Sequence, residues 1–183
     1  EVDLTPFGFK GKMALITLDN GYDHNRPNTI GVQGLQSLNA ALDVAIAADV
    51  DAIGITGKPF IFAAGAYLSG VAGVADRTLA HAFTKLGHDV FRRFGECGKP
   101  TFAFINGLAL GGGLEIGLHC QYRTLATTAM IGLPEVFLGL VPGWGGATLL
   151  PKLIGPELAT RVIIVNALNN NTMLKSPEAL EIG

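Results

Sequence analysis

The sequence predicts a single α/β domain. Short apolar segments rich in β-branched residues alternate along the chain with longer segments whose apolar residues recur at helical spacing. Hydrophobic residues make up 49% of the 183 residues and charged residues 15%, so the chain can bury a substantial core and is not disordered. No repeat, linker or low-complexity tract divides it, and we therefore treat residues 1–183 as one domain.

The first half of the chain alternates between the two patterns. We expect strands over residues 12–19 and 52–56 and from Phe60, and helices over residues 33–48 and 77–94. The segment from Asn20 to Gly31 is rich in Asn, Gly and Pro and is expected to form turns. A strand–helix–strand unit closes with a right-handed crossover, so the first two strands are expected to lie parallel.

The second half continues the alternation. We expect a strand over residues 101–105, a helix over 114–121, a strand over 122–131, a helix over 145–154 broken at Pro151, and a helix over 156–167. Gly155 and Pro156 are typical of a helix start. This order of elements favours the α/β class.

The stretch from Ala103 to Gly146 contains two turns dense in glycine, each next to a carboxylate. Gly111–Gly113 come just before Glu115, and Glu135 comes before the second cluster at residues 142–146. Consecutive glycines cost backbone entropy and are tolerated where a ligand or another backbone must approach closely. The two glutamates stand 20 positions apart, so only the fold can bring them together.

The same stretch offers backbone donors. Gly112 and Gly113 precede a helix, so free N–H groups point at whatever lies over them. Ala66 follows an apolar strand, and its small neighbours leave its N–H accessible. Two converging N–H groups make an oxyanion hole, and two nearby carboxyls separate in pKa into acid and base, which suggests proton transfer through an enolate. Alternatively, the glycines only allow tight packing, and each glutamate is solvated or caps a helix.

Other functions find little support. No phosphate-binding glycine motif or Gly-x-Ser-x-Gly elbow is present. A net charge of −2 argues against nucleic acid as the main partner, and neither a membrane-spanning run nor a signal peptide is expected. Cys97 and Cys120 are expected to be buried thiols in a reducing, cytoplasmic compartment. His81 and His88 share a helix face, but without a third ligand we expect solvated histidines and no metal.

Four segments resemble the enoyl-CoA hydratase/isomerase (crotonase) superfamily. They are FAAGAYL at residues 62–68, INGLALGGGLE at 105–115, GLPEVFLGLVPGWGG at 132–146 and GPELATRVI at 155–163. The resemblance implies a spiral of repeated ββα units, an acyl-CoA thioester as substrate, and assembly into trimers or hexamers. It implies no separate cofactor, because coenzyme A is part of the substrate.

The resemblance also implies roles for individual residues. The N–H groups of Ala66 and Gly112 would hold the thioester oxygen, and Glu115 and Glu135 match the two catalytic glutamates of the hydratases. Substrate contacts are expected from Ala64, Gly65, Tyr67, Leu68 and Gly111. Tyr67 stands where the family frequently has Asp. The implied reaction is hydration of a 2-enoyl-CoA in fatty-acid β-oxidation, with an isomerase or another acyl-CoA enolate enzyme as one alternative and a non-catalytic acyl-CoA-binding or assembly module as another.

Two further residues and the tail complete the expectations. Lys58 is expected either to meet coenzyme A phosphates or to be a solvated loop lysine, and Trp144 either to line the acyl pocket or to pack in the core. Residues 173–183 resemble the hydratase half of multifunctional fatty-acid oxidation proteins. We therefore expect the family's C-terminal helical part to be missing and the chain to be a piece of a longer one.

Overall fold

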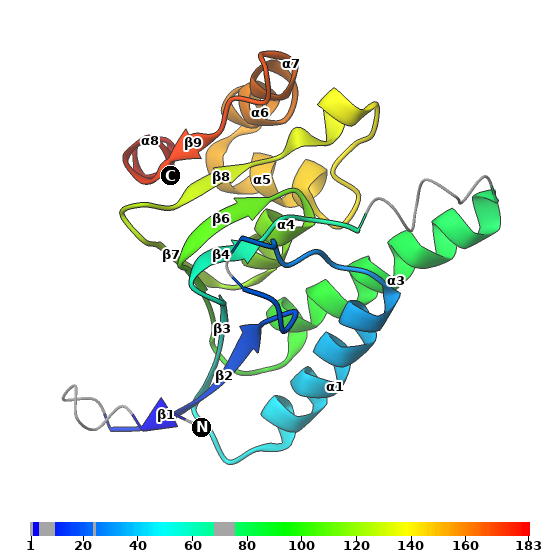
Figure 1. Ribbon diagram of the computed structural model, residues 1–183. Helices are drawn as coiled ribbons and strands as arrows, with labels where there is room; N and C mark the ends of the chain where they lie inside the picture. Colours follow the sequence, from blue (N-terminus) through cyan, green and yellow to red (C-terminus); the bar gives the residue numbers. More distant parts are fainter. Residues whose placement is uncertain (1, 4–9, 24, 68–75) are drawn as a thin grey trace.

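The strands form two sheets. The computed structural model describes residues 2–3, 10–23, 25–67 and 76–183 (Figure 1). In these residues the first sheet holds, in spatial order, β1 (Val2–Asp3), β2 (Lys12–Leu18), β3 (Ala52–Gly57), β5 (Thr101–Ile105) and β7 (Tyr122–Leu125). The second holds β4 (Phe60–Ala63), β6 (Gly107–Leu110), β8 (Met130–Gly132) and β9 (Leu174–Lys175). Neighbouring strands are parallel, except that β1 and β9 run antiparallel to their partners.

Successive strand pairs connect the two sheets. β3 is followed by β4, β5 by β6 and β7 by β8, and in each pair the first strand joins the first sheet and the second strand joins the second sheet. Helix α3 (Arg77–Glu96) follows the first of these pairs, and α4 (Gly112–His119) follows the second. The fold is therefore the spiral of ββα units that the resemblance implies. The expected parallel pairing of β2 with β3 is confirmed.

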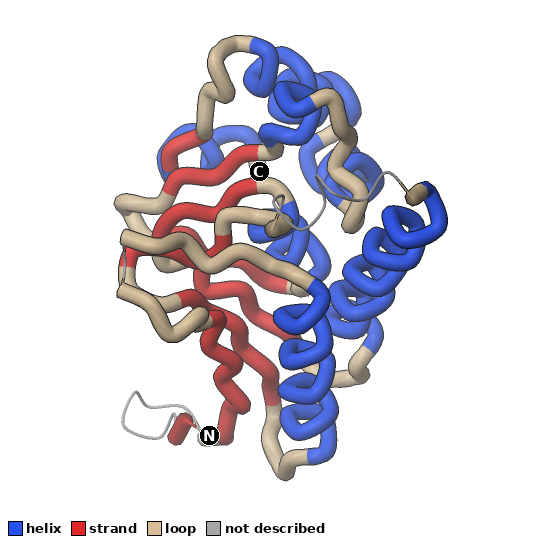
Figure 2. Tube along the Cα trace, turned by 45° about the vertical axis from the view of Figure 1, so that its right-hand side comes forward, coloured by secondary structure: helices blue, strands red, loops and turns tan. Residues whose placement is uncertain are grey.

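Helices α1 (Val32–Ala47) and α3 lie together on one side of the strands (Figures 1 and 2). Both bury the apolar stripe that their spacing predicts, through Leu35, Leu38 and Leu42 in α1 and through Val90 and Phe94 in α3. Leu79 also belongs to the predicted stripe of α3 but is 58% exposed. The reason is its place in the first turn of the helix, which extends beyond the strands (Figure 1).

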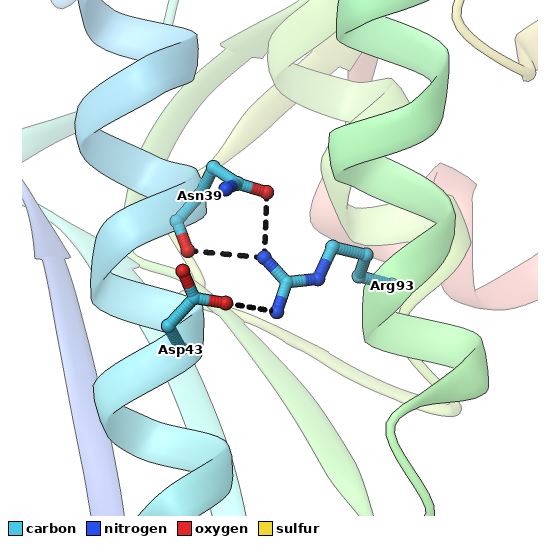
Figure 3. Close-up of polar contacts among 3 residues, drawn as sticks. All are labelled: Asn39, Asp43 and Arg93. Carbon is cyan, nitrogen blue, oxygen red and sulfur yellow. Dashed lines mark hydrogen bonds and ion pairs between the residues drawn. The ribbon is translucent and has the colours of Figure 1, made fainter.

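A polar clasp joins α1 to α3 (Figure 3). Arg93 of α3 donates from Nη1 to the main-chain oxygen and Oδ1 of Asn39 on α1, and from Nη2 to Oδ1 of Asp43 at 2.6 Å. The planar guanidinium presents its donors in a rigid fork, which lets it reach acceptors on two successive turns of α1 at once. The clasp links two successive turns of α1 to the C-terminal half of α3.

The C-terminal third is mainly helical. Its helices are α5 (Gly146–Ile154), α6 (Pro156–Thr160), α7 (Asn166–Leu168) and α8 (Ser176–Ile182). A 3-10 turn, η2 (Pro134–Leu138), precedes them, and a π-helical segment, η3 (Arg161–Val165), joins α6 to α7. The expected helix start at Pro156 is confirmed, and this helical run ends before Asn169, as the asparagines there predict.

Three local predictions are wrong. Residues 122–131 form two strands in different sheets, because a turn closed by Ala129 N–H donating to the carbonyl of Ala126 separates them. Residues 107–110 form β6, although they were expected only to lead into the glycine turn. Pro151 does not break α5, since a proline removes one hydrogen bond while the buried Leu150 holds the helix against the core.

Substitution of Gly87 tests how closely α3 packs against the Trp144 ring. A Cβ atom at Gly87 would lie 2.2 Å from Nε1 of Trp144, whereas one at Gly34 in α1 would meet nothing within 4 Å. We expect Gly87→Ala to lower the free energy of unfolding by about 1–3 kcal/mol through overpacking. Gly34→Ala, the matched control, should raise it by up to about 1 kcal/mol through helix propensity. Urea unfolding measures both, and a Gly87→Ala protein as stable as the Gly34→Ala protein would contradict the packing.

Candidate active site

Three backbone segments meet at one end of the second sheet. β4, β6 and β8 are adjacent and parallel, so the residues that follow each strand emerge at the same edge. These are residues 64–66 after β4, residues 111–113 after β6, and residues 133–135 after β8. The carboxyl ends of parallel strands are where α/β sheets place their ligand sites. This topology brings the predicted donors and both glutamates to one place.

The glycine turn before α4 packs closely against its neighbours. A Cβ atom at Gly113 would lie 2.1 Å from the carbonyl oxygen of Ala63, and one at Gly112 would lie 2.5 Å from the Trp144 ring. Gly111 has a φ of 52°, in the left-handed region that favours glycine. These glycines therefore do allow tight packing. It does not exclude a ligand, because the same packing leaves the first N–H groups of α4 at the edge of the sheet.

Two N–H groups at this edge are available to a ligand. Ile30 donates to the carbonyl of Gly65 at 2.8 Å and accepts from the N–H of Tyr67 at 3.0 Å. In a parallel pairing this turns the N–H of Ala66, between them, to the opposite side. Gly112 is the first residue of α4 and has no partner within the helix. In the described part of the chain neither N–H has an acceptor, and a Cβ at Gly65 would lie 3.4 Å from the Gly112 nitrogen.

Glu115 lies in the first turn of α4 and is only 2% exposed. Its Oε1 accepts hydrogen bonds from the backbone N–H groups of Trp144 and Gly146, both at 2.8 Å. Burial raises the pKa of Glu115 to about 7, and the nearby charge of Glu135 adds to the rise, while the two N–H groups oppose it. Oε2 of Glu115 has no hydrogen bond in the described residues and is free to act on a water.

Glu135 reaches the same place from η2. A Cβ at Gly111 would lie 2.5 Å from Oε1 of Glu135, so this carboxyl stands directly over the glycine turn. Its Oε2 is buried without a hydrogen-bond partner among the described residues. Burial raises the pKa of Glu135 to about 7, opposed by its own backbone N–H. A buried carboxylate oxygen without a donor is costly, so this oxygen is suited to a proton or a water.

Trp144 packs in the core. It is 5% exposed, and its ring meets Phe83 and Phe91 edge to face, with centroids 5.3 and 5.2 Å away. It also lies against Gly112, as described above. Of the two expectations for Trp144, its surroundings match core packing, and it supports the glycine turn from behind.

The surroundings of Lys58 match neither expectation. Its side chain is 4% exposed, so the prediction of a solvated lysine is wrong. Its ammonium donates to Oδ1 of Asn20 at 2.5 Å and to the carbonyls of Tyr22 and Asp23 at 3.0 and 2.8 Å. These three bonds use all three donors and leave none for a coenzyme A phosphate. Lys58 instead anchors the turn at residues 20–23.

The remaining predicted residues lie around the edge. Ala64 donates its N–H to the carbonyl of Asn28 at 2.7 Å, and Tyr67 is 51% exposed beside Ala66. Leu68 lies outside the described residues. Sequence reasoning missed Asn28, which is 5% exposed and donates to the carbonyls of Leu18 and Phe62 at 2.7 and 3.2 Å. A buried asparagine in a run of turn residues carries no signal that distinguishes it from a solvated one.

Metal and membrane sites find no support in the described residues. They contain no group of three or more His, Cys, Asp or Glu that could hold a metal ion, and no helix long and apolar enough to span a membrane. His88 is half-buried and meets the His119 ring at 5.7 Å, so the prediction of a solvated residue is wrong for it. Cys120 is buried as expected, and burial raises its pKa to about 12, whereas Cys97 is half-buried.

A largely apolar cavity of about 920 Å³ lies elsewhere, against β7, α5 and α8. Its lining includes Leu118, Leu125, Leu150, Leu174 and Ile182. Neither glutamate borders it. The cavity is therefore separate from the site at the edge of the second sheet.

Comparison with known proteins agrees with this geometry. The family described as Enoyl-CoA hydratase/isomerase matches residues 8–183. A short-chain-enoyl-CoA hydratase from Clostridium acetobutylicum is 36% identical over 95% of this chain, and a fatty acid oxidation complex subunit alpha from Colwellia psychrerythraea is 58% identical over 40% of it. The chain spans 64% of the first relative's length and 10% of the second's.

A solved structure shows the same fold. The crystal structure of an enoyl-CoA hydratase from Thermoplasma volcanium superposes with a TM-score of 0.84 at 29% identity, covering 95% of this chain and 68% of that one. Sequence and structure therefore agree on the family. The chain belongs to the enoyl-CoA hydratase/isomerase family.

Proposed function

We propose that the protein adds water across the 2,3 double bond of a 2-enoyl-CoA. The observation that carries the proposal is the convergence of two carboxyls, each with a pKa raised to about 7, on the turn that presents the N–H of Gly112. A hydratase needs one protonated and one ionised carboxyl at neutral pH. A coupled pair with pKa values near 7 supplies both forms.

The two N–H groups would stabilise the enolate. With the thioester oxygen between the N–H groups of Ala66 and Gly112, negative charge that develops on this oxygen meets two donors that are already oriented. Each donor of this kind commonly contributes about 3–4 kcal/mol to lowering the barrier. A positioned acid or base adds about 100- to 10,000-fold in rate, so neither effect would suffice alone.

The surroundings of the glutamates favour a division of roles. Glu115 has Oε1 held by two N–H groups, and its free Oε2 would take a proton from water as the water oxygen bonds to C3. Glu135 would deliver its proton to C2, since its Oε2, buried and without a partner among the residues that the structure describes, favours the protonated form. Proton exchange through a second water would restore the pair. No cofactor is needed beyond the coenzyme A of the substrate.

Assembly and cellular setting extend the proposal. The name of the Colwellia relative makes it a subunit of a complex, and we propose that this chain likewise acts in a homo-oligomer or as part of a larger multifunctional chain in fatty-acid β-oxidation. Exposed apolar side chains after Glu135, at Phe137, Leu138, Leu140 and Val141, support association. Two free cysteines fit a reducing, cytoplasmic compartment.

Substitution of each glutamate tests the reaction. Loss of absorbance at the conjugated enoyl-thioester band of crotonyl-CoA reports hydration. We expect Glu115→Gln and Glu135→Gln each to lower kcat about 100- to 10,000-fold, because the amide neither takes nor gives a proton. Glu157→Gln, on the exposed surface of α6, is the control and should retain activity.

The same assay separates the alternatives. An isomerase relying on one base would tolerate Glu115→Gln while moving the double bond of a 3-enoyl-CoA. Thioester binding without turnover by the unaltered protein would favour a non-catalytic module and contradict the hydratase proposal.

The raised pKa of Glu135 also predicts a pH dependence of stability. The ordinary value is 4.5, so between about pH 4.5 and 7 the folded chain holds a proton that the unfolded chain has lost, and stability falls as pH rises through this window. We expect Glu135→Gln to remove this loss and to unfold with a free energy about 1–3 kcal/mol above that of the unaltered protein near pH 8. Urea unfolding should show the two proteins converging toward pH 4.5. A difference that is the same at every pH would contradict the assignment.

A further inference from the structure

We propose that His119 is a positioning residue for Glu115 and acts through the backbone of Trp144. The inference deepens the proposed function and rests on it, because it concerns the residue assigned to activate water. His119 stands four positions after Glu115, so both side chains lie on the same face of α4, one turn apart. Between them they hold residues 144–146.

The two side chains bind this segment in opposite senses, since Glu115 accepts hydrogen bonds from it and His119 donates one to it. Glu115 Oε1 accepts from the N–H of Trp144 and of Gly146, and Nε2 of His119 lies 2.7 Å from the carbonyl oxygen of Trp144. A carbonyl oxygen only accepts, so Nε2 must carry the proton and the histidine donates. One residue of the loop is thus fixed at both its N–H and its C=O by a single helix.

The fit leaves little freedom for the loop to settle elsewhere. A Cβ at Gly145 would lie 2.6 Å from Nε2 of His119, and one at Gly146 would lie 3.1 Å from Oε1 of Glu115. Gly145 has a φ of 123°, a conformation that favours glycine. Without the bond from His119, the carbonyl of Trp144 would lack this donor, and the peptide would turn toward another one. That turn would move the N–H groups of Trp144 and Gly146 away from Glu115.

The charged groups that face His119 come from α3. His88 meets its ring, and Glu96 is near enough to act on its charge. Burial lowers the pKa of His119, the bond to the Trp144 carbonyl opposes this, His88 lowers it further and Glu96 raises it. The neutral imidazole that results is sufficient for the donor role. Glu115 in turn faces the charge of Glu135 from η2.

Two substitutions at one position test the inference. His119→Gln keeps an N–H donor near the position of Nε2, and His119→Met removes it at similar size. We expect the Met protein to titrate Glu115 at higher pH by about one pH unit, because the N–H groups that favour the ionised form are displaced. The Gln protein should titrate as the unaltered protein does. Carboxyl ¹³C NMR of glutamate-labelled protein, assigned with Glu115→Gln, measures this without activity.

Kinetics supply the second readout. In crotonyl-CoA hydration the Met protein should lose at least about tenfold in kcat with little change in KM, and the Gln protein should recover most of it. His81→Gln, at an exposed position of α3 without a ring contact to His119 among the described residues, is the control and should match the unaltered protein. Equal titration of Glu115 in the Met and Gln proteins would overturn the inference.

Two results keep the inference separate from the proposed function and from folding. If the unaltered protein does not hydrate crotonyl-CoA but the titrations differ as expected, the hydratase proposal fails and the positioning role stands. If the Met protein does not fold, ¹⁵N NMR of His119 in the unaltered protein decides. The Nε2–H tautomer supports the inference, and the Nδ1–H tautomer overturns it.

Discussion

The hydrogen bonds from the Trp144 and Gly146 N–H groups to Oε1 of Glu115 organise the molecule around one buried carboxyl. Burying an ionised carboxylate without partners would cost several kcal/mol, and two backbone donors offset much of that cost. To supply them, the chain must turn sharply at Gly145 and place the Trp144 ring between α3 and α4. Gly87 and Gly112 leave room for that ring, so the glycines of three distant segments serve one contact.

The balance of forces at this contact explains the chemistry that the site can perform. Burial raises the pKa of both glutamates to about 7, and the donors on Glu115 keep its rise from going further. The spiral then brings the carboxyls together with the N–H groups of Ala66 and Gly112, because β4, β6 and β8 end at the same edge of one sheet. The order of the strands brings the two carboxyls close to the N–H groups, and burial sets the pKa values of the carboxyls.

The sequence predicted the site best at residue types that occur in few structural settings. Consecutive glycines at a helix start pointed to a close approach, and Gly112 indeed packs against Trp144, while its N–H has no acceptor in the part of the chain that the structure describes. It failed where tertiary contacts decide. Residues 107–110 form β6 because β4 and β8 lie on either side of them. The local sequence contains no pattern that predicts these two neighbouring strands. Lys58 is buried because a distant turn offers it three oxygens, and His119 gains its place from a loop 25 positions away.

The measurement that tests this account most directly is the infrared carbonyl stretch of crotonyl-CoA labelled with ¹³C at the thioester carbon. Binding to the Glu135→Gln protein should hold the substrate in place without turnover. If the N–H groups of Ala66 and Gly112 receive the thioester oxygen, the band should move to lower frequency than in water, because two donors in a buried site polarise the carbonyl more than solvent does. A bound substrate whose band stays at its frequency in water would contradict the account.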